Sequence, residues 1–216
     1  MWDHPLFHAV LESPDDDASR LVLADWLEEQ GSSLAEFIRV QVAIAASKRA
    51  KEDPNPDTLR REVQLYLQHK NAWQSSIHRR MMQTTSLSVE EAASLMSGML
   101  FHRGLPSWMG IAVDRLIEHG DALLAVAPWD SLRLDHEALP TFEELAQWPG
   151  LKQFRVLVTQ SYGSDVEQLI LSPHLREVER LTIACPRNEQ QRLAGVCRRA
   201  EFTRLSSCRV GTYRVV

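Results

Sequence analysis

The chain has 216 residues, of which 44% are hydrophobic and 25% are charged, a composition typical of a globular protein with a buried core. The net charge of −5 is unevenly distributed, because residues 1–50 hold nine acidic and four basic residues, whereas residues 151–216 hold six acidic and eleven basic ones. We therefore expect a basic C-terminal end. No stretch approaches the ~20 apolar residues that a membrane-spanning helix needs.

The three cysteines are Cys185, Cys197 and Cys208, and none of them forms a CxxC pair. An odd number without that spacing argues against a disulfide framework and against a zinc site, and it favours a reducing compartment. The first residues lack the basic stretch and the long apolar run of a secretion signal. We expect a soluble cytoplasmic protein without metal or cofactor.

The first forty residues predict three helices. Residues 5–11 form a short apolar helix, and Asp15 or Asp16 is placed to cap the next helix, which ends at Gly31. Ser33 and Glu36, three positions apart, have the spacing of a capping box and should open the third helix.

A polar, proline-containing break at residues 51–57 separates this region from the next helices. Apolar residues then recur at three- and four-residue spacings over 59–81, which predicts one long amphipathic helix. Residues 89–101 are expected to hold one more short helix.

The second half of the chain changes to a longer period. Four leucines stand 25, 24 and 24 positions apart, at Leu132, Leu157, Leu181 and Leu205. A second leucine column falls between them, at Leu145, Leu169 and Leu193. A period near 24 lies in the range of leucine-rich repeats, in which each unit is a short strand, here 131–134 or 180–183, followed by a loop and a helix. Neighbouring units stack, because one unit cannot bury its own apolar edge.

The repeats are irregular. Thr159 and Ser207 replace the second strand leucine in two units. The turn position that usually carries Asn holds Glu137, Tyr162, Pro186 and Val210. We therefore predict a mixed α/β fold with two parts. A helical domain over residues 1–100 packs on a short, irregular leucine-rich-repeat solenoid over 101–216, which has a small parallel sheet and a degraded last unit.

One dense motif opens the chain. It comprises Pro14–Asp17, Arg20–Val22, Ala24–Glu29, Gly31 and Ala35–Gln41, which read PDDD, RLV, ADWLEE, G and AEFIRVQ. This pattern, about forty residues long, resembles a bacterial repeat-companion domain. The resemblance implies leucine-rich repeats downstream, in agreement with the 24-residue period, and a scaffold or interaction protein rather than an enzyme.

Three more specific interpretations of this region lack support. Asp15 and Asp17 alternate as calcium ligands do, but the central glycine and closing glutamate of a calcium loop are missing. The helix pair around Gly31 has the layout of a helix-turn-helix, but its second helix is apolar around most of its circumference. His4 and His8 share a helix face without a third metal ligand. Helix capping explains the aspartates without any ligand.

Asp25 stands beside Trp26 in an apolar helix. A lone buried carboxylate would be costly, so we expect a structural ion pair with Arg39 across helices, or with Arg20. This interpretation is favoured over a catalytic acid.

The basic end supplies the predicted binding surface. The side chains expected to share one exposed strand face stand just before or just after the strand leucines, at Arg133, Val158, Arg180, Thr182, Arg204 and Ser206. Arginine is favoured in interfaces and in contacts with carboxylates, so the expected partner is a protein with an acidic surface. The simpler alternative is a solvated charged face without a partner.

Together these features predict a non-catalytic protein-binding protein, an adaptor or regulatory subunit that can hold a signalling partner inactive. The alternative is a nucleic-acid-binding accessory protein that uses the basic end, with an affinity that falls steeply with salt. The net negative charge and the absence of an RNA-stacking motif argue against that alternative. An enzyme would need scattered His, Asp and Cys residues to converge in one pocket.

Overall fold

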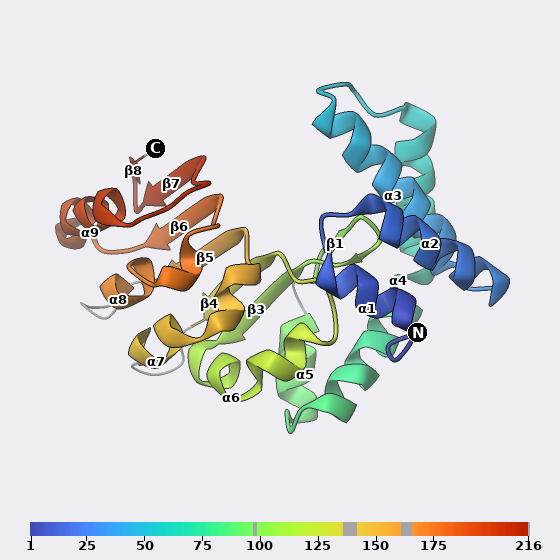
Figure 1. Ribbon diagram of the computed structural model, residues 1–216, viewed down its shortest axis with the longest axis horizontal. Coiled ribbons are helices and arrows are strands. Elements are labelled where there is room, and N and C mark those ends of the chain that lie inside the picture. Colours follow the sequence, from blue (N-terminus) through green and yellow to red (C-terminus); the bar gives the residue numbers. More distant parts are fainter. Residues whose placement is uncertain (97–98, 136–141, 161–165, 216) are drawn as a thin grey trace. The chain divides into compact units, whose positions relative to one another are not determined.

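The chain divides into two compact units (Figure 1). The computed structural model describes residues 1–96, 99–135, 142–160 and 166–215, so the expected turn residues Glu137 and Tyr162 lie outside the described residues. The helical unit comprises Met1–Met96, Leu100–Ser107 and Ala125–Pro128, and the sheet unit comprises Ser97–Met99, Trp108–Leu124 and Trp129–Val216. The fold class is mixed α/β.

The helical unit consists mainly of helices that follow one another along the chain. They are α1 (Pro5–Glu12), α2 (Asp17–Glu29), α3 (Leu34–Arg49), α4 (Pro56–Thr84) and α5 (Val89–Met96). A two-stranded antiparallel hairpin of β1 (Phe101–His102) and β2 (Leu105–Pro106) completes the unit. The predicted helices over the first 96 residues are confirmed.

Two predicted helix starts have different outcomes. Asp16 caps α2 by accepting hydrogen bonds from the backbone N–H groups of Ala18 and Ser19, at 3.0 and 3.1 Å. The capping box predicted at Ser33 and Glu36 is wrong, because the Ser33 side chain makes no capping bond. The Glu36 carboxylate accepts instead from Arg61 of α4, at 2.6 and 2.7 Å.

A capping box does form at the start of α5, where the sequence analysis had not placed one. The Ser88 N–H donates to Glu91 Oε2 at 2.7 Å, and the Glu91 N–H donates to Ser88 Oγ at 3.2 Å. Both bonds join groups three positions apart, so the local sequence alone is sufficient to form this cap.

The core of the helical unit is aromatic at its centre. Phe37 of α3 is fully buried, and its ring lies 4.6 Å from the ring of Trp73 on α4 and 5.8 Å from that of Phe101 on β1. Phe7 and Leu23 extend this core to α1 and α2. One apolar cluster therefore joins α1–α4 to the hairpin.

Arg103, in the turn between β1 and β2, fixes the hairpin to the start of α2. Its guanidinium donates to the backbone oxygen of Asp15 at 2.9 Å and pairs with the carboxylates of Asp15 and Asp17, both at 3.1 Å. The buried Arg20 donates to the backbone oxygens of Pro14 and Arg103, at 2.9 and 3.4 Å. We call these contacts the Arg103 anchor. They give the aspartate-rich segment a structural role.

The turn itself requires a glycine. Gly104 has a φ of +83°, and its N–H donates to the Gln41 side-chain oxygen at 2.7 Å. A Cβ atom on Gly104 would lie 2.4 Å from the Cα of Ile38. The hairpin backbone therefore packs directly on α3 at this point.

The sheet unit alternates strands and helices. Its strands are β3 (Trp108–Ala112), β4 (Ser131–Asp135), β5 (Val156–Gln160), β6 (Arg180–Ala184), β7 (Ser207–Val210) and β8 (Tyr213–Arg214). The helical segments between them are α6 (Val113–Leu124), α7 (Phe142–Gln147), η1 (Pro149–Gln153), α8 (Val166–Ile170), η2 (Pro173–Leu175) and α9 (Arg187–Arg199). The strands lie in chain order, with β3 to β7 parallel and β8 antiparallel to β7.

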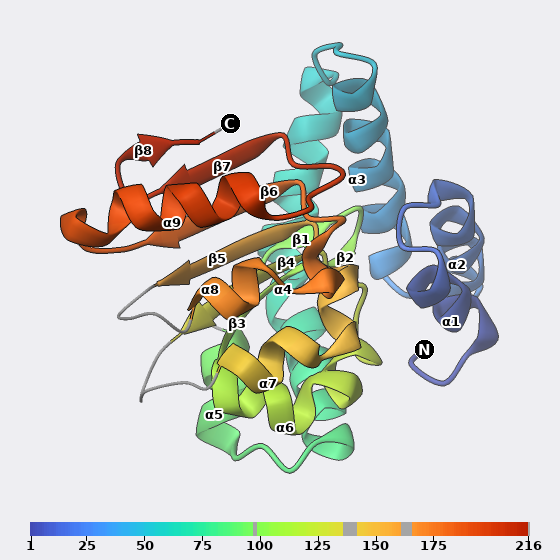
Figure 2. The ribbon, with the colours of Figure 1, turned by 60° about the vertical axis from the view of Figure 1, so that its left-hand side comes forward.

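The helices α6–α9 lie in a row on one side of this sheet (Figure 2). Alternate strand residues face these helices and are buried, among them Leu132, Leu157, Leu181 and Cys208 in one line across the sheet. The intervening residues are mostly half-buried or exposed. The sheet thus has one face that the helices cover and an opposite face, which we call the strand face.

The last unit has a register that differs from the predicted one. The leucine period predicts that Leu205 lies opposite Leu181, but Cys208 occupies that position. The strand β7 therefore begins three residues later than predicted. The reason is the length of the preceding helix: α9 has 13 residues, whereas α7 and α8 have 6 and 5. The longer helix uses more chain before the next strand can pair.

We predict that Gly104→Ala lowers the free energy of unfolding by about 3 kcal/mol or more, because a Cβ atom would clash with α3 and the left-handed backbone would be strained. The matched control is Gly31→Ala. Gly31 also has a positive φ, +69°, but nothing lies within 4 Å of a Cβ placed there, so a loss of about 1 kcal/mol is expected. Urea unfolding of both variants measures the difference, and equal losses would contradict the packing of Gly104 on α3.

We also predict that Arg103→Met destabilises the helical unit by about 2–4 kcal/mol, because it leaves the carboxylates and the carbonyl of the Arg103 anchor without their buried donor. Arg49→Met is the control, since Arg49 pairs with the same Asp17 carboxylate. The Arg49 side chain is 60% exposed, against 10% for Arg103, so the control should lose less than ~1 kcal/mol. Thermal unfolding monitored by circular dichroism measures both variants. Equal losses of stability would contradict the structural role of the Arg103 anchor.

Candidate functional site

The strand face of the sheet unit is the candidate binding surface. It consists of the strand residues that alternate with the buried ones, namely Trp108, Gly110, Ala112, Ser131, Arg133, Asp135, Val156, Val158, Gln160, Arg180, Thr182, Ala184, Ser207 and Arg209. Backbone pairing arranges these residues in rows that cross the strands. Their Cα positions are therefore fixed by the sheet rather than by loops.

Three of the six predicted residues share one row. Gly110, Arg133, Val158, Thr182 and Arg209 lie opposite one another in that order across β3 to β7. Arg180 belongs to the next row, between Val156 and Ser207. The structure thus places Arg133, Val158, Arg180 and Thr182 on the strand face.

Arg204 and Ser206 do not belong to the strand face, so their predicted place on it is wrong. Both precede β7, because the long α9 shifts the last strand. Arg204 Nε lies 3.1 Å from Glu177 Oε2, and the Ser206 hydroxyl donates to the backbone oxygen of Glu179 at 2.9 Å. Their polar groups therefore hold the connection into β7.

Arg209 takes the place predicted for Ser206, because it follows Cys208 and lies opposite Thr182, and Ser207 takes the place predicted for Arg204, opposite Arg180. Arg209 stands between Cys208 and Val210, which are both fully buried, and its side chain is exposed. The alternation of apolar and polar residues over 207–210 was the available signal. The leucine period concealed it, because Leu205 fits the period and lies outside the strand.

Arg133 is bound within the sheet. Its guanidinium lies over the Trp108 ring, 4.9 Å from the centroid, and makes a two-point pair with Asp135, Nε to Oδ1 at 2.8 Å and Nη2 to Oδ2 at 3.0 Å. Gly110 leaves room for this arrangement, since a Cβ there would lie 3.0 Å from Arg133 Nη2. The charge of Arg133 is therefore compensated inside the unit.

Arg180 and Arg209 are in a different situation. Both are exposed, and neither has a hydrogen bond or an ion pair with any residue in the described part of the chain. Arg209 lies opposite Thr182, and Arg180 precedes Thr182 by two positions on the same strand. Two uncompensated cations therefore stand diagonally across neighbouring strands, on the same face as the half-buried Val158 and Thr182.

The predicted ion pair of the helical unit involves Arg39. Arg39 Nη2 donates hydrogen bonds to Glu28 Oε2 and Asp25 Oδ1, both at 2.8 Å, and these bonds raise the pKa of Arg39 above its usual value. Arg20 belongs to the Arg103 anchor instead. The expectation that Asp25 is buried is wrong, because its side chain is 69% exposed. An exposed pair contributes little stability.

The histidines and cysteines that the structure describes suggest no reactive centre. His4 caps α1 by accepting from the Leu6 N–H at 3.3 Å, and its ring stacks on Trp26 at 4.1 Å. All three cysteines are free thiols. No group of three or more His, Cys, Asp or Glu side chains in the described ranges could hold a metal ion.

Comparisons with known proteins give no identity for this chain. No family model matches the sequence, and no curated protein or solved structure matches it either. Within the residues that the structure describes, no helix combines the length and the apolar character needed to cross a membrane.

We predict that one thiol, Cys185, reacts with a disulfide reagent in the folded protein, and that all three react after unfolding. Cys197 and Cys208 are buried and hydrogen-bond to each other. Burial and the nearby Glu189 raise the pKa of the half-buried Cys185 thiol. Because the thiolate is the reactive form, the reaction of Cys185 should be slow near neutral pH. It should accelerate at a higher pH than the reaction of a free thiol does. A time course of the reaction with the disulfide reagent checks this, with Cys185→Ser as the control. Rapid reaction of all three thiols in the folded protein would contradict the prediction.

Proposed function

We propose that this chain is a non-catalytic protein-binding protein, an adaptor or a regulatory subunit able to hold a signalling partner inactive. In this proposal the sheet unit is a short, irregular leucine-rich-repeat arc that contacts an acidic segment of the partner through its strand face. The helical unit is a repeat-companion scaffold for the arc.

Recurring backbone hydrogen bonds support the repeat interpretation. The carbonyl oxygens of Asp130, Arg155 and Glu179 each accept two N–H groups from the residues that enter the next strand, at 2.7–3.1 Å. Each of these carbonyls stands two positions before the leucine of its own strand, Leu132, Leu157 or Leu181. The same joint between successive units thus repeats with the period seen in the sequence, as expected of stacked repeats.

The observation that carries the proposal is the pair of uncompensated arginines on the strand face. Arg180 and Arg209 lack partners among the described residues and stand beside Val158 and Thr182, which are half-buried. Strong interface contacts combine an arginine with an adjacent apolar surface from which water is excluded on binding. A carboxylate-bearing protein segment satisfies both requirements.

Nucleic-acid binding is the alternative, and it would use the basic charge differently. Contacts to phosphates follow the total positive charge on a surface more than its exact position. The exposed Arg187 and Arg198 of α9 would then matter as much as the strand-face pair. This difference permits a charge-matched experiment.

We predict that Arg180→Glu/Arg209→Glu reduces capture of the partner from native lysate at least ~10-fold, because two attractive contacts become repulsive. The control Arg187→Glu/Arg198→Glu makes the same change in net charge on α9 and should retain the partner. Tagged pull-down with quantitative mass spectrometry measures both.

Two results would overturn the proposal. Retention of the partner by Arg180→Glu/Arg209→Glu would exclude the strand face as the binding surface. Equal loss in both double variants, together with release of the captured material by nuclease, would favour the nucleic-acid alternative.

A further inference from the structure

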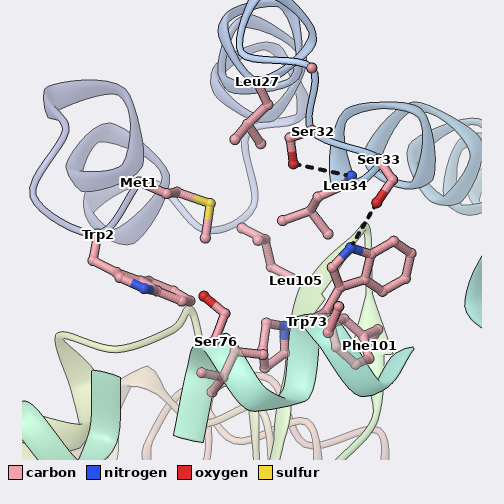
Figure 3. A pocket seen from close by; sticks show the side chains of 14 residues that line it. Met1, Trp2, Leu27, Ser32, Ser33, Leu34, Trp73, Ser76, Phe101 and Leu105 are labelled. Carbon is pink, nitrogen blue, oxygen red and sulfur yellow. Dashed lines mark hydrogen bonds between the residues drawn. The ribbon is translucent and has the colours of Figure 1, made fainter. Parts of the chain in front are cut away.

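The helical unit contains a cavity of about 380 Å³ that plays no part in the proposed protein binding. It lies among the first residues of the chain, the turn between α2 and α3, the middle of α4, and the β1–β2 hairpin (Figure 3). We call it the Trp73 pocket, after one of the residues that line it. Its volume falls within the range of small-molecule sites, about 300–1,000 Å³.

Three aromatic rings and several aliphatic side chains form its walls. The rings belong to Trp2, Trp73 and Phe101, and Leu34 and Leu105 add aliphatic surface. Trp73 is held by Phe37 at 4.6 Å and by Phe101 at 6.0 Å between ring centroids. The walls are thus shaped by the core of the unit, and the pocket exists before any ligand binds.

The residues that line the pocket include no Asp, Glu, Lys, Arg or His in the ranges the structure covers. An ionised ligand would therefore lose hydration without a charged side chain to compensate it, which is costly. The uncharged side chains of the wall therefore favour a neutral ligand.

Hydroxyl groups supply the polar part of the wall. Ser33 Oγ accepts from Trp73 Nε1 at 3.3 Å and Ser32 Oγ accepts from the Leu34 N–H at 3.4 Å, so both use acceptor lone pairs. The Ser76 side chain makes no hydrogen bond to the described residues, and the hydroxyl protons of all three serines find no acceptor among them. Figure 3 shows Ser76 extending from α4 toward the cavity. The wall therefore offers hydrogen-bond donors to a ligand.

We propose that the Trp73 pocket binds a neutral, flat aromatic small molecule that carries a hydrogen-bond acceptor such as a carbonyl oxygen. The aromatic rings of the pocket pack against the ring system of the ligand, and the serine hydroxyls donate to its acceptor. This site is independent of the strand face, which belongs to the other unit.

The probe for the test is prodan, a neutral naphthyl ketone whose fluorescence reports the polarity around its carbonyl group. The protein carries any affinity tag at its C-terminus, because Met1 lines the pocket. We expect saturable binding to the wild-type chain with a blue-shifted emission. No saturable binding would overturn the proposal.

Two neighbouring serines on α4 give a matched pair of variants. Ser76 and Ser75 are both exposed, but Ser76 lines the pocket whereas Ser75 bonds to the backbone oxygen of Asn71 at 2.7 Å. Ser76→Trp should fill the pocket and weaken prodan binding at least ~10-fold, and Ser75→Trp should leave it unchanged. Equal binding by Ser76→Trp and the wild type would place prodan elsewhere and overturn the proposal.

A smaller change tests the hydrogen bond. Ser76→Ala should weaken prodan binding about threefold and shift the emission further to the blue, because one donor to the ketone is lost. Unchanged affinity and emission would overturn the assigned role of the hydroxyl. Arg180→Glu/Arg209→Glu should bind prodan as the wild type does, so failure of the strand-face proposal and failure of this one are distinguishable.

Discussion

The helical unit depends on bringing the turn of a late hairpin against the start of its second helix. Arg103 contacts the carboxylates of Asp15 and Asp17 and the backbone oxygen of Asp15 across more than eighty residues of sequence, and Arg20 donates to the backbone oxygen of Arg103. Two guanidinium groups in such a small volume are stable only with several oxygen ligands. The aspartate-rich segment supplies those oxygens and also the Asp16 cap of α2.

This role explains why the opening motif looked like a functional site. A cluster of carboxylates, a buried arginine and a tryptophan are also the components of metal and catalytic centres. Here the carboxylates of Asp15 and Asp17 face a fixed cation, and Asp16 faces backbone N–H groups. Charges compensated in this way hold elements together.

Sequence analysis was sufficient where an element depends on nearby residues. The Asp16 cap, the helices and the strands β4 and β6 follow from local chemistry and from a regular leucine spacing. It failed where a distant group competes. Glu36 pairs with Arg61 of α4 instead of closing a cap, and the length of α9 moves β7 away from Leu205. Neither competitor is visible in the local pattern.

The same limit applies to the candidate site, where the sequence shows which cations exist but not which are compensated. In the sheet unit Arg133 pairs with Asp135, and Arg204 pairs with Glu177. Exposed arginines without a partner among the described residues occur on α9 as well, so the lack of a partner does not by itself mark a binding surface. What distinguishes Arg180 and Arg209 is their place beside Val158 and Thr182 on a sheet that fixes their spacing. A partner that neutralises both charges must also exclude water from the half-buried Val158 and Thr182. The free energy gained by burying them adds to that of the ion pairs.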